Sequence, residues 1–219
     1  MYYAIIGDII NSKKINNRLA TQEKLKHYLE IINKEYQDDI AANFIITLGD
    51  EFQGLLKTST HLFTILNKIE IVMRPLRIRF GIGVGDILTK IDNKMSIGSD
   101  GPAWWRARDM ISDLKKNQTG LKLISNIKIA GIDDQNILDL LNINLSFCYS
   151  VKSNWTKEQR EVNDYITLHY GLTDHFIQKR VAEEMGLSPV NVNKKLKLSL
   201  FYDLVYAQNT IMKILENER

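Results

Sequence analysis

Three acidic residues stand where two apolar segments of the sequence end, and their side chains could bind a divalent cation. Asp8 follows the apolar run Tyr2–Ile6, and Asp50 and Glu51 follow a second run, Asn43–Leu48. If the two runs are neighbouring strands of one sheet, these carboxylates converge at one of its edges. Carboxylate oxygens are ligands for Mg²⁺ or Mn²⁺, which keep several waters and share their other positions with substrate phosphates. We therefore expect a metal site formed by Asp8, Asp50 and Glu51.

The turn before these residues adds a reason to expect a phosphate there. Gly49 has no side chain, so a phosphate could approach its backbone closely. A simpler interpretation stays open, because acidic residues at hairpin tips are usually solvated turn residues. Asp8 could likewise do no more than cap a loop. The apolar runs on both sides of the turn favour the hairpin itself under either interpretation.

The elements that must position this site alternate between strands and helices over residues 1–132. Strand, helix, hairpin, helix, strand, helix and strand follow one another, which predicts an α+β fold with a palm-like, ferredoxin-like sheet and helices on one face. The expected ranges after the first strand and the hairpin are a helix at Arg18–Tyr36, a helix ending before Pro75, a strand at Arg77–Val84, a helix at Pro102–Lys116 and a strand at Leu121–Ile124.

A stretch of weaker pattern follows at 133–154. We expect a linker there, with a short helix and a strand-like segment at Leu145–Val151.

The first 132 residues resemble the catalytic fold shared by class III nucleotide cyclases and GGDEF diguanylate cyclases. The resemblance rests on the strand ending at Asp8, on Gly49-Asp50-Glu51-Phe52 in the hairpin, and on Phe80-Gly81-Ile82-Gly83-Val84-Gly85. It implies Asp8 with Asp50 or Glu51 as ligands of two divalent cations, and it implies a triphosphate contact for Arg108. It also implies a homodimer, since cyclase-type sites assemble between two chains.

The sequence departs from these families at three positions. The first glycine of a GGDEF signature is absent, because Leu48 precedes Gly49. Ile46 stands where class III cyclases carry a base-selecting lysine, and Trp104 stands where they carry an asparagine. The metal and phosphate features therefore match better than the features that read the base. Over nearly its whole length the chain also resembles the SatD family, through Gly7-Asp8 and Gly49-Asp50-Glu51-Phe52-Gln53.

From residue 155 to residue 219 the pattern is wholly helical. A helix at Thr156–His169, a second at Phe176–Met185 and a long third helix after Ser188-Pro189 predict an all-α helix-turn-helix domain. The stripe of the long third helix is Leu196, Leu200, Leu204, Ala207, Ile211 and Leu215.

The start of that third helix could contact DNA. Asparagine can read adenine edges, and lysine can neutralise phosphates or contact guanine. The candidate DNA-binding residues are Asn191, Asn193, Lys194, Lys195 and Lys197. Against this, residues 155–219 hold nine basic and nine acidic residues, so the segment has no net charge. The lysines could instead form a solvated helix face, and the third helix could pack on the first domain or on a second subunit.

Composition limits the remaining classes. The chain has 219 residues, 44% of them hydrophobic, with 29 basic against 26 acidic side chains. These values fit a globular protein and exclude disordered or collagen-like classes. The single cysteine, Cys148, forms no internal disulfide, and no secretory signal or membrane span is evident, so we expect a cytoplasmic protein.

These patterns together predict a bacterial cytosolic regulator. Its palm-like domain would bind a nucleotide triphosphate or similar ligand through Mg²⁺ or Mn²⁺, and its helix-turn-helix tail would bind DNA. Two alternatives stay open. One is a metal-dependent nucleotidyl or phosphoryl transferase using the same carboxylates. The other is a degenerate palm domain kept as a structural dimerisation module.

Overall fold

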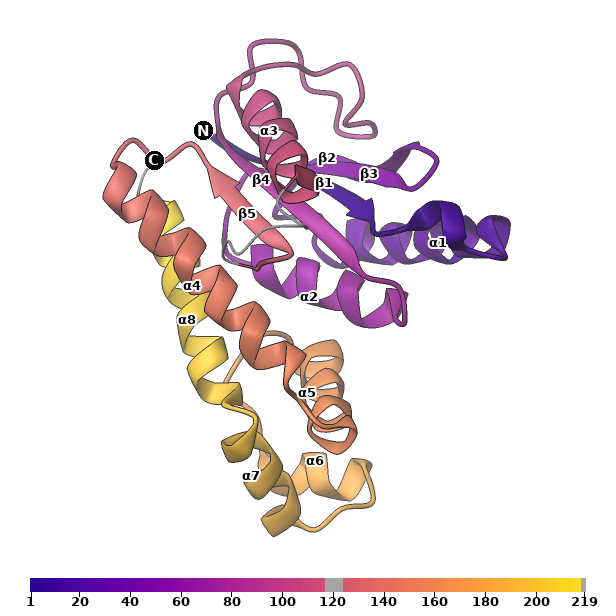
Figure 1. Ribbon diagram of the computed structural model, residues 1–219, viewed down its shortest axis with the longest axis vertical. Coiled ribbons are helices and arrows are strands. Elements are labelled where there is room, and N and C mark those ends of the chain that lie inside the picture. Colours follow the sequence, from indigo (N-terminus) through magenta and orange to yellow (C-terminus); the bar gives the residue numbers. More distant parts are fainter. Residues whose placement is uncertain (117–123, 218–219) are drawn as a thin grey trace.

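A five-stranded mixed sheet forms the centre of the computed structural model, which describes residues 1–116 and 124–217 (Figure 1). The strands lie in the order β2-β3-β1-β4-β5, with β4 and β5 parallel and the other neighbours antiparallel. The fold is therefore of the α+β class. The strands are β1 (Tyr2–Ile9), β2 (Ile40–Leu48), β3 (Glu51–Leu56), β4 (Ile78–Gly85) and β5 (Ile127–Ala130).

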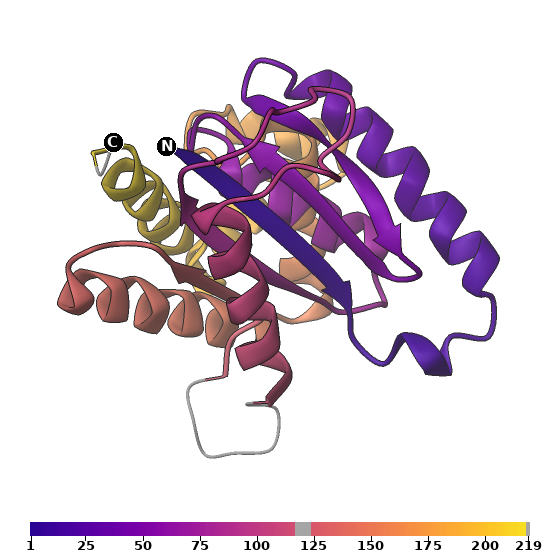
Figure 2. The same cartoon turned by 90° about the horizontal axis from the view of Figure 1, so that it is seen from above.

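Both faces of this sheet are covered, which differs from the one-sided cover expected from the sequence. Helices α1 (Arg18–Glu35) and α2 (Leu62–Met73) lie on one face, and α3 (Pro102–Lys116) lies across the other (Figures 1 and 2). Because side chains alternate along a strand, β1 serves both layers. Tyr3 and Ile5 join the core under α1 and α2, whereas Ala4 and Ile6 join a smaller cluster under α3.

Two glycines of β4 let α3 approach the sheet closely. A β-carbon at Gly83 would lie 1.9 Å from the carbonyl oxygen of Ala103, and one at Gly81 would lie 2.3 Å from that of Ala107. The alternate glycines of β4 therefore match a helix that packs with its backbone almost against the strand.

The last strand of the sheet is β5 rather than the segment expected at Leu121–Ile124. Residues 121–123 of that segment lie outside the described residues, and Ile124 is not in a strand. β5 begins at Ile127 and pairs with β4, with Phe80 opposite Ile127.

The segment at 133–154 is a helix where the sequence pattern suggested a linker with a strand-like part. α4 (Gln135–Ser153) is continuous, and Asp134 caps its first turn by accepting hydrogen bonds from the backbone N–H groups of Asn136 and Ile137. The strand expected at Leu145–Val151 is therefore wrong. Its apolar residues belong to a helical stripe in which the buried positions recur every three or four residues: Leu141, Leu145, Cys148 and Lys152.

The remaining elements of the described residues are a 3₁₀ helix, η1 (Ser12–Lys14), and four α-helices: α5 (Lys157–Tyr170), α6 (Gln178–Glu184), α7 (Pro189–Leu198) and α8 (Phe201–Asn217). The capping box at the start of α5 is present, formed by Thr156 and Gln159.

The long third helix expected after Ser188 is divided into α7 and α8. Leu200 adopts a left-handed backbone with φ 53°, which interrupts the helix although the apolar spacing continues across the break. The Trp155 indole donates to the Ser199 carbonyl at 2.8 Å, and the Ser199 hydroxyl donates to the Leu196 carbonyl at 3.0 Å. These contacts satisfy backbone groups that the break leaves free.

The C-terminal helix packs back against the sheet layer. α8 runs beside α4 in Figure 1, and the Tyr3 hydroxyl donates to the Leu215 carbonyl at 2.8 Å. One buried apolar cluster extends from β1 through α2 and α4 to α8.

A buried polar group joins the same elements. The Lys152 ammonium of α4 donates to Asn67 Oδ1 of α2 at 2.9 Å and pairs with Glu70, while Asn67 donates to Gln208 of α8 at 2.9 Å. No helix among the described residues is long and apolar enough to cross a membrane.

Candidate functional site

The register of the sheet brings the two acidic segments together. Asp8 of β1 lies directly opposite Glu51 of β3, and the Ile9 N–H donates to the Asp50 carbonyl at 3.4 Å. Directly paired residues of neighbouring strands point their side chains to the same face. Asp8 and Glu51 therefore face the same side of the sheet. We call this part of the sheet, with Asp8, Gly49, Asp50 and Glu51, the acidic corner.

Two cations from other elements contact the Asp8 carboxylate. Nη1 of Arg79 donates to Oδ2 of Asp8 at 2.7 Å, and Nζ of Lys115 lies 2.8 Å from Oδ1. The side chains of Asp8 and Arg79 are each 9% exposed, whereas that of Lys115 is 45% exposed. The carboxylate is thus buried between two cations, of which only Lys115 is substantially exposed.

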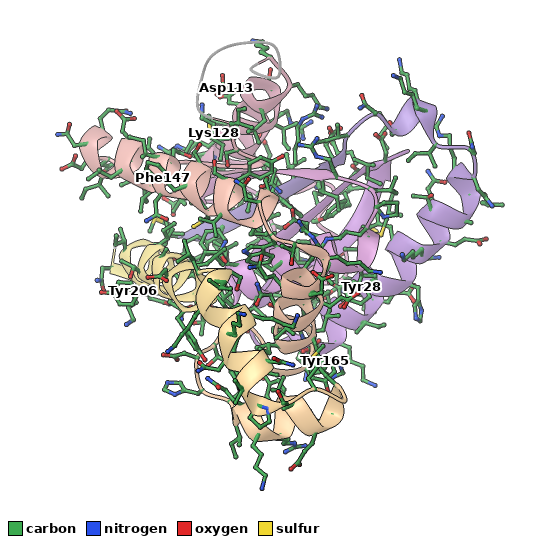
Figure 3. All side chains as sticks on the ribbon, turned by 60° about the horizontal axis from the view of Figure 1, so that its bottom comes forward. Tyr28, Asp113, Lys128, Phe147, Tyr165 and Tyr206 are labelled. Atoms are coloured by element: carbon green, nitrogen blue, oxygen red, sulfur yellow. The ribbon has the colours of Figure 1, made fainter. Side chains whose placement is uncertain are left out.

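Strand pairing and helix packing bring both cations to Asp8. Arg79 is the register partner of Asp8 on β4, so it shares the face of Asp8. Lys115 stands one turn after the buried Ile111 and therefore on the side of α3 that faces the sheet. An ion pair between Asp113 of α3 and Lys128 of β5 fixes the same end of this helix (Figure 3).

The hairpin turn is shaped by a glycine and by α1. Gly49 has φ 66°, a left-handed conformation that glycine adopts without strain. Its carbonyl accepts a hydrogen bond from the Gln22 side chain of α1. A β-carbon at Gly49 would lie 3.7 Å from Nη2 of Arg18, so a guanidinium stands beside the turn. The Thr47 hydroxyl donates to the Glu51 carbonyl at 3.2 Å and closes the hairpin from β2.

Arg108 does not share this corner. It is exposed on α3, two turns before Lys115, which places it about 10 Å from Lys115 along the helix axis. A triphosphate contact by Arg108 stays a prediction.

The described residues contain no group of three or more His, Cys, Asp or Glu side chains placed to hold a metal ion. The paired residues Asp8 and Glu51 give the corner two neighbouring carboxylates, and both are hard oxygen donors. This number is small for a structural metal site made by the chain alone. It matches Mg²⁺ sites in which phosphates and water supply most of the ligands.

The five candidate DNA-binding residues divide into two groups around α7. Asn191, Lys194 and Lys197 are exposed, whereas Asn193 and Lys195 are partly buried at the sides of the helix. The Ser188 hydroxyl caps the first turn by accepting from the Asn191 N–H at 3.2 Å. Three of the five thus lie on the face that is open to a partner.

The sequence matches one known protein family over most of its length. The SatD family model matches residues 2–215, which is nearly the whole sequence. The chain belongs to the SatD family. No curated protein matches this SatD chain.

The sequence did not indicate three residues of the acidic corner: Arg79, Lys115 and Arg18. A signal existed for Arg79, because a charged residue inside an otherwise apolar strand usually has a buried partner. Lys115 follows Ile111 at helical spacing, but the sequence does not indicate which strand end the helix reaches. Arg18 could be found only from the packing of α1 beside the hairpin.

Proposed function

We propose that the acidic corner binds a nucleotide polyphosphate together with Mg²⁺ or Mn²⁺. The observation that carries the proposal is the pairing of Asp8 with Glu51 across β1 and β3, with a cationic group 2.8 Å from Asp8 on its solvent side. Asp50 and Glu51 are partly exposed beside the buried Asp8, which is paired with Arg79 and Lys115.

The residues present fit a divalent cation. The Lys115 ammonium lies beside Asp8 Oδ1, so a divalent cation would have to take its place there. The last turn of α3 lies at the same place, and a helix C-terminus carries partial negative charge that favours cations. Asp8 with Glu51 or Asp50 would hold the ion, which when bound would screen the charge of the polyphosphate.

The hairpin turn supports the phosphate part of the proposal. Gly49 leaves its backbone open, and the Arg18 guanidinium stands beside it. Guanidinium groups bind phosphate oxygens through two parallel hydrogen bonds. The palm-like comparison rests on the strand order β2-β3-β1-β4 with the hairpin next to β1, together with the motif resemblance to nucleotide cyclases.

A thermal-shift experiment tests this proposal. We expect ATP or GTP with Mg²⁺ or Mn²⁺ to raise the melting temperature of the wild type and not of Asp50→Asn, which changes a turn residue outside the Asp8–Arg79 pair. The matched control is Asp203→Asn on the exposed side of α8, which should respond as the wild type does. Equal responses of the wild type, Asp50→Asn and Glu51→Gln would contradict the metal assignment, because either carboxylate could hold the ion with Asp8. If no nucleotide changes the melting temperature of the wild type, nucleotide binding is rejected and the structural dimerisation module is the remaining alternative.

A turnover measurement distinguishes a transferase from a protein that only binds the nucleotide. Chromatography of the same mixtures after incubation should show unchanged nucleotide if the chain only binds it. A product that depends on Mg²⁺ or Mn²⁺ and on Asp50 would instead show an enzyme.

For the tail, we propose DNA binding through α6, the turn after it and α7. The observation in favour is the exposed row of Asn191, Lys194 and Lys197 at a capped helix start, where a recognition helix makes its base contacts. Together with the acidic corner, this gives a nucleotide-responsive regulator. A homodimer is proposed from the cyclase resemblance, and light scattering of the purified chain measures it.

Fluorescence anisotropy with DNA from upstream of the gene tests the tail. Binding should weaken steeply with salt, and each of Lys194→Ala and Lys197→Ala should reduce the salt slope by about 1. Lys213→Ala, on α8, is the control and should leave the slope unchanged. An unchanged slope in the Lys194→Ala/Lys197→Ala double variant would reject the α7 assignment.

A further inference from the structure

We propose that α4 forms the interface of a homodimer, in which its outer face packs antiparallel against the same face of a second copy of the chain. The outer face consists of Leu140, Ile143, Phe147 and Val151, which follow one another at intervals of three or four residues. This inference rests on the homodimer of the proposed function and names its contact surface. It uses no residue of the acidic corner.

α4 is apolar on two opposite sides. Its inner side packs into the core through Leu141, Leu145 and Cys148. On its outer side, Leu140 is 64% exposed and Phe147 is 67% exposed (Figure 3). A surface helix normally carries polar and charged residues on its outer side, and a helix that is apolar all round is buried. None of the described elements covers these two side chains, so burying them takes a second molecule.

The charges along α4 favour a copy of the chain in antiparallel orientation. No charged residue occurs over positions 140–151, so the face meets its own copy without opposing charges. Three exposed acidic residues gather at the N-terminal end: Asp133, Asp134 and Asp139. Beyond the C-terminal end the charge is mixed, with the exposed Lys157 next to the exposed Glu158. A parallel pair would place the two acidic ends against each other, whereas an antiparallel pair separates them and also opposes the two helix dipoles.

The spacing of the two most exposed residues fits a two-fold axis. With the axis beside Ile143 and Asn144, Leu140 of each copy lies opposite Phe147 of the other, because the two positions are equally far from that point. The smaller side chain of one copy then meets the larger side chain of the other on both sides of the axis. Such a self-complementary contact is what a two-fold dimer requires.

The size of the face sets the expected affinity. α4 has 19 residues and is therefore about 28 Å long. One face of a helix this long buries less than the roughly 800 Å² per partner of a standard interface. We therefore expect a dimer that dissociates in the micromolar range, and its association must be measured over a concentration series.

Sedimentation velocity of the full chain over such a series tests the inference. We expect the wild type to dimerise, and we expect Leu140→Glu and Phe147→Lys each to raise the dissociation constant at least about tenfold, because each puts a charge into an apolar contact. The double variant Leu140→Glu/Phe147→Lys should recover part of this loss. Only in the antiparallel pair does the negative charge introduced in one copy face the positive charge introduced in the other. Leu19→Glu, at a 68% exposed position of α1, is the matched control and should dimerise as the wild type does.

The outcomes separate the inference from the proposed function. If the wild type dimerises and both single variants dimerise as tightly, the α4 surface is wrong and the homodimer stands. If the double variant dissociates as readily as the single variants or more readily, the antiparallel pairing is rejected. If the wild type stays monomeric at every concentration, the homodimer and this inference both fail, while nucleotide binding is decided separately by the thermal-shift experiment.

Discussion

Asp8 and Arg79 form a buried ion pair across β1 and β4, with Nη1 of Arg79 2.7 Å from Oδ2 of Asp8. Both side chains are 9% exposed, so neither charge is well solvated without the other. The pair therefore stabilises the corner only while both partners are present, and its loss should lower the free energy of unfolding of the whole protein.

Arg79→Met should lower the free energy of unfolding by about 3 kcal/mol, because it leaves the buried Asp8 carboxylate with only the Lys115 partner. Lys115→Met is the matched variant on the other oxygen, and its exposed pair should cost less than about 1 kcal/mol. Urea denaturation followed by circular dichroism measures both. Equal losses in the two variants would show that burial does not distinguish the two partners.

Gly83→Ala should destabilise the protein by about 2 kcal/mol or more, since the added β-carbon would meet the Ala103 carbonyl at 1.9 Å. The atom it meets belongs to the helix backbone, so α3 must move away from β4. Ser112→Ala, on the exposed side of α3, should change stability by less than about 0.5 kcal/mol. A Gly83→Ala variant with an unchanged urea midpoint would contradict the close packing of α3.

On each edge strand of the sheet, an asparagine side chain pairs with the backbone of one residue. Asn142 of α4 accepts from the Ile129 N–H at 2.9 Å and donates to its carbonyl at 3.0 Å. Asn33 of α1 does the same to Phe44, with distances of 2.7 Å and 2.9 Å. Such contacts satisfy edge groups that could otherwise pair with another chain.

Asn142→Ala should therefore cost about 2 kcal/mol through the two hydrogen bonds lost to Ile129 and a third lost to the Leu138 carbonyl, and Asn33→Ala should cost a similar amount. Each variant should also self-associate more than the wild type in light scattering at equal concentration. Asn136→Ala, an exposed residue of α4, is the control. If neither variant changes in stability or association, the side chains do not protect the edges.

Burial raises the pKa of the Cys148 thiol from 9.0 to about 11, while the nearby Lys152 opposes the shift. At pH 8 the thiolate fraction is then about 100-fold smaller than in a free thiol, because each pKa unit changes it tenfold. Iodoacetamide should modify the native chain at least that much more slowly than the urea-unfolded chain, measured by mass spectrometry. Equal rates would show that the thiol is accessible, and Cys148→Ala provides the unlabelled control.

The raised pKa of Cys148 also makes the free energy of unfolding depend on pH. Since the folded state holds the thiol proton to higher pH, the unfolded chain ionises first as the pH rises. The contribution of Cys148 to stability is therefore full below pH 9 and decreases between pH 9 and about pH 11. Comparing the pH dependence of unfolding in the wild type and in Cys148→Ala over this range isolates the effect.

Local patterns were enough for much of the fold. The apolar run at Tyr2–Ile6, the Gly49-Asp50 turn and the helix beginning at Pro102 each predict their element, because strand periodicity, turn chemistry and helix starts depend on neighbouring residues. The opposition of Asp8 and Glu51 follows from the same reasoning once the hairpin is placed beside β1.

Other features depended on contacts between distant segments. The segment at 145–151 reads as a strand by composition, yet it is helical because its apolar residues fit the surface between β5 and α8. At the division of α7 from α8, the Ser199 carbonyl accepts a hydrogen bond from Trp155, which is distant in the sequence.

The sequence by itself determined which residues carry the acidic charge and predicted the strand and the hairpin that hold them, whereas the pairing of β1 with β3 is a finding of the structure. Only the tertiary structure decided that Arg79 and Lys115 neutralise Asp8. Ion pairs form between side chains that the fold brings within 3 Å, and the spacing of residues 8, 79 and 115 along the chain contains no such information.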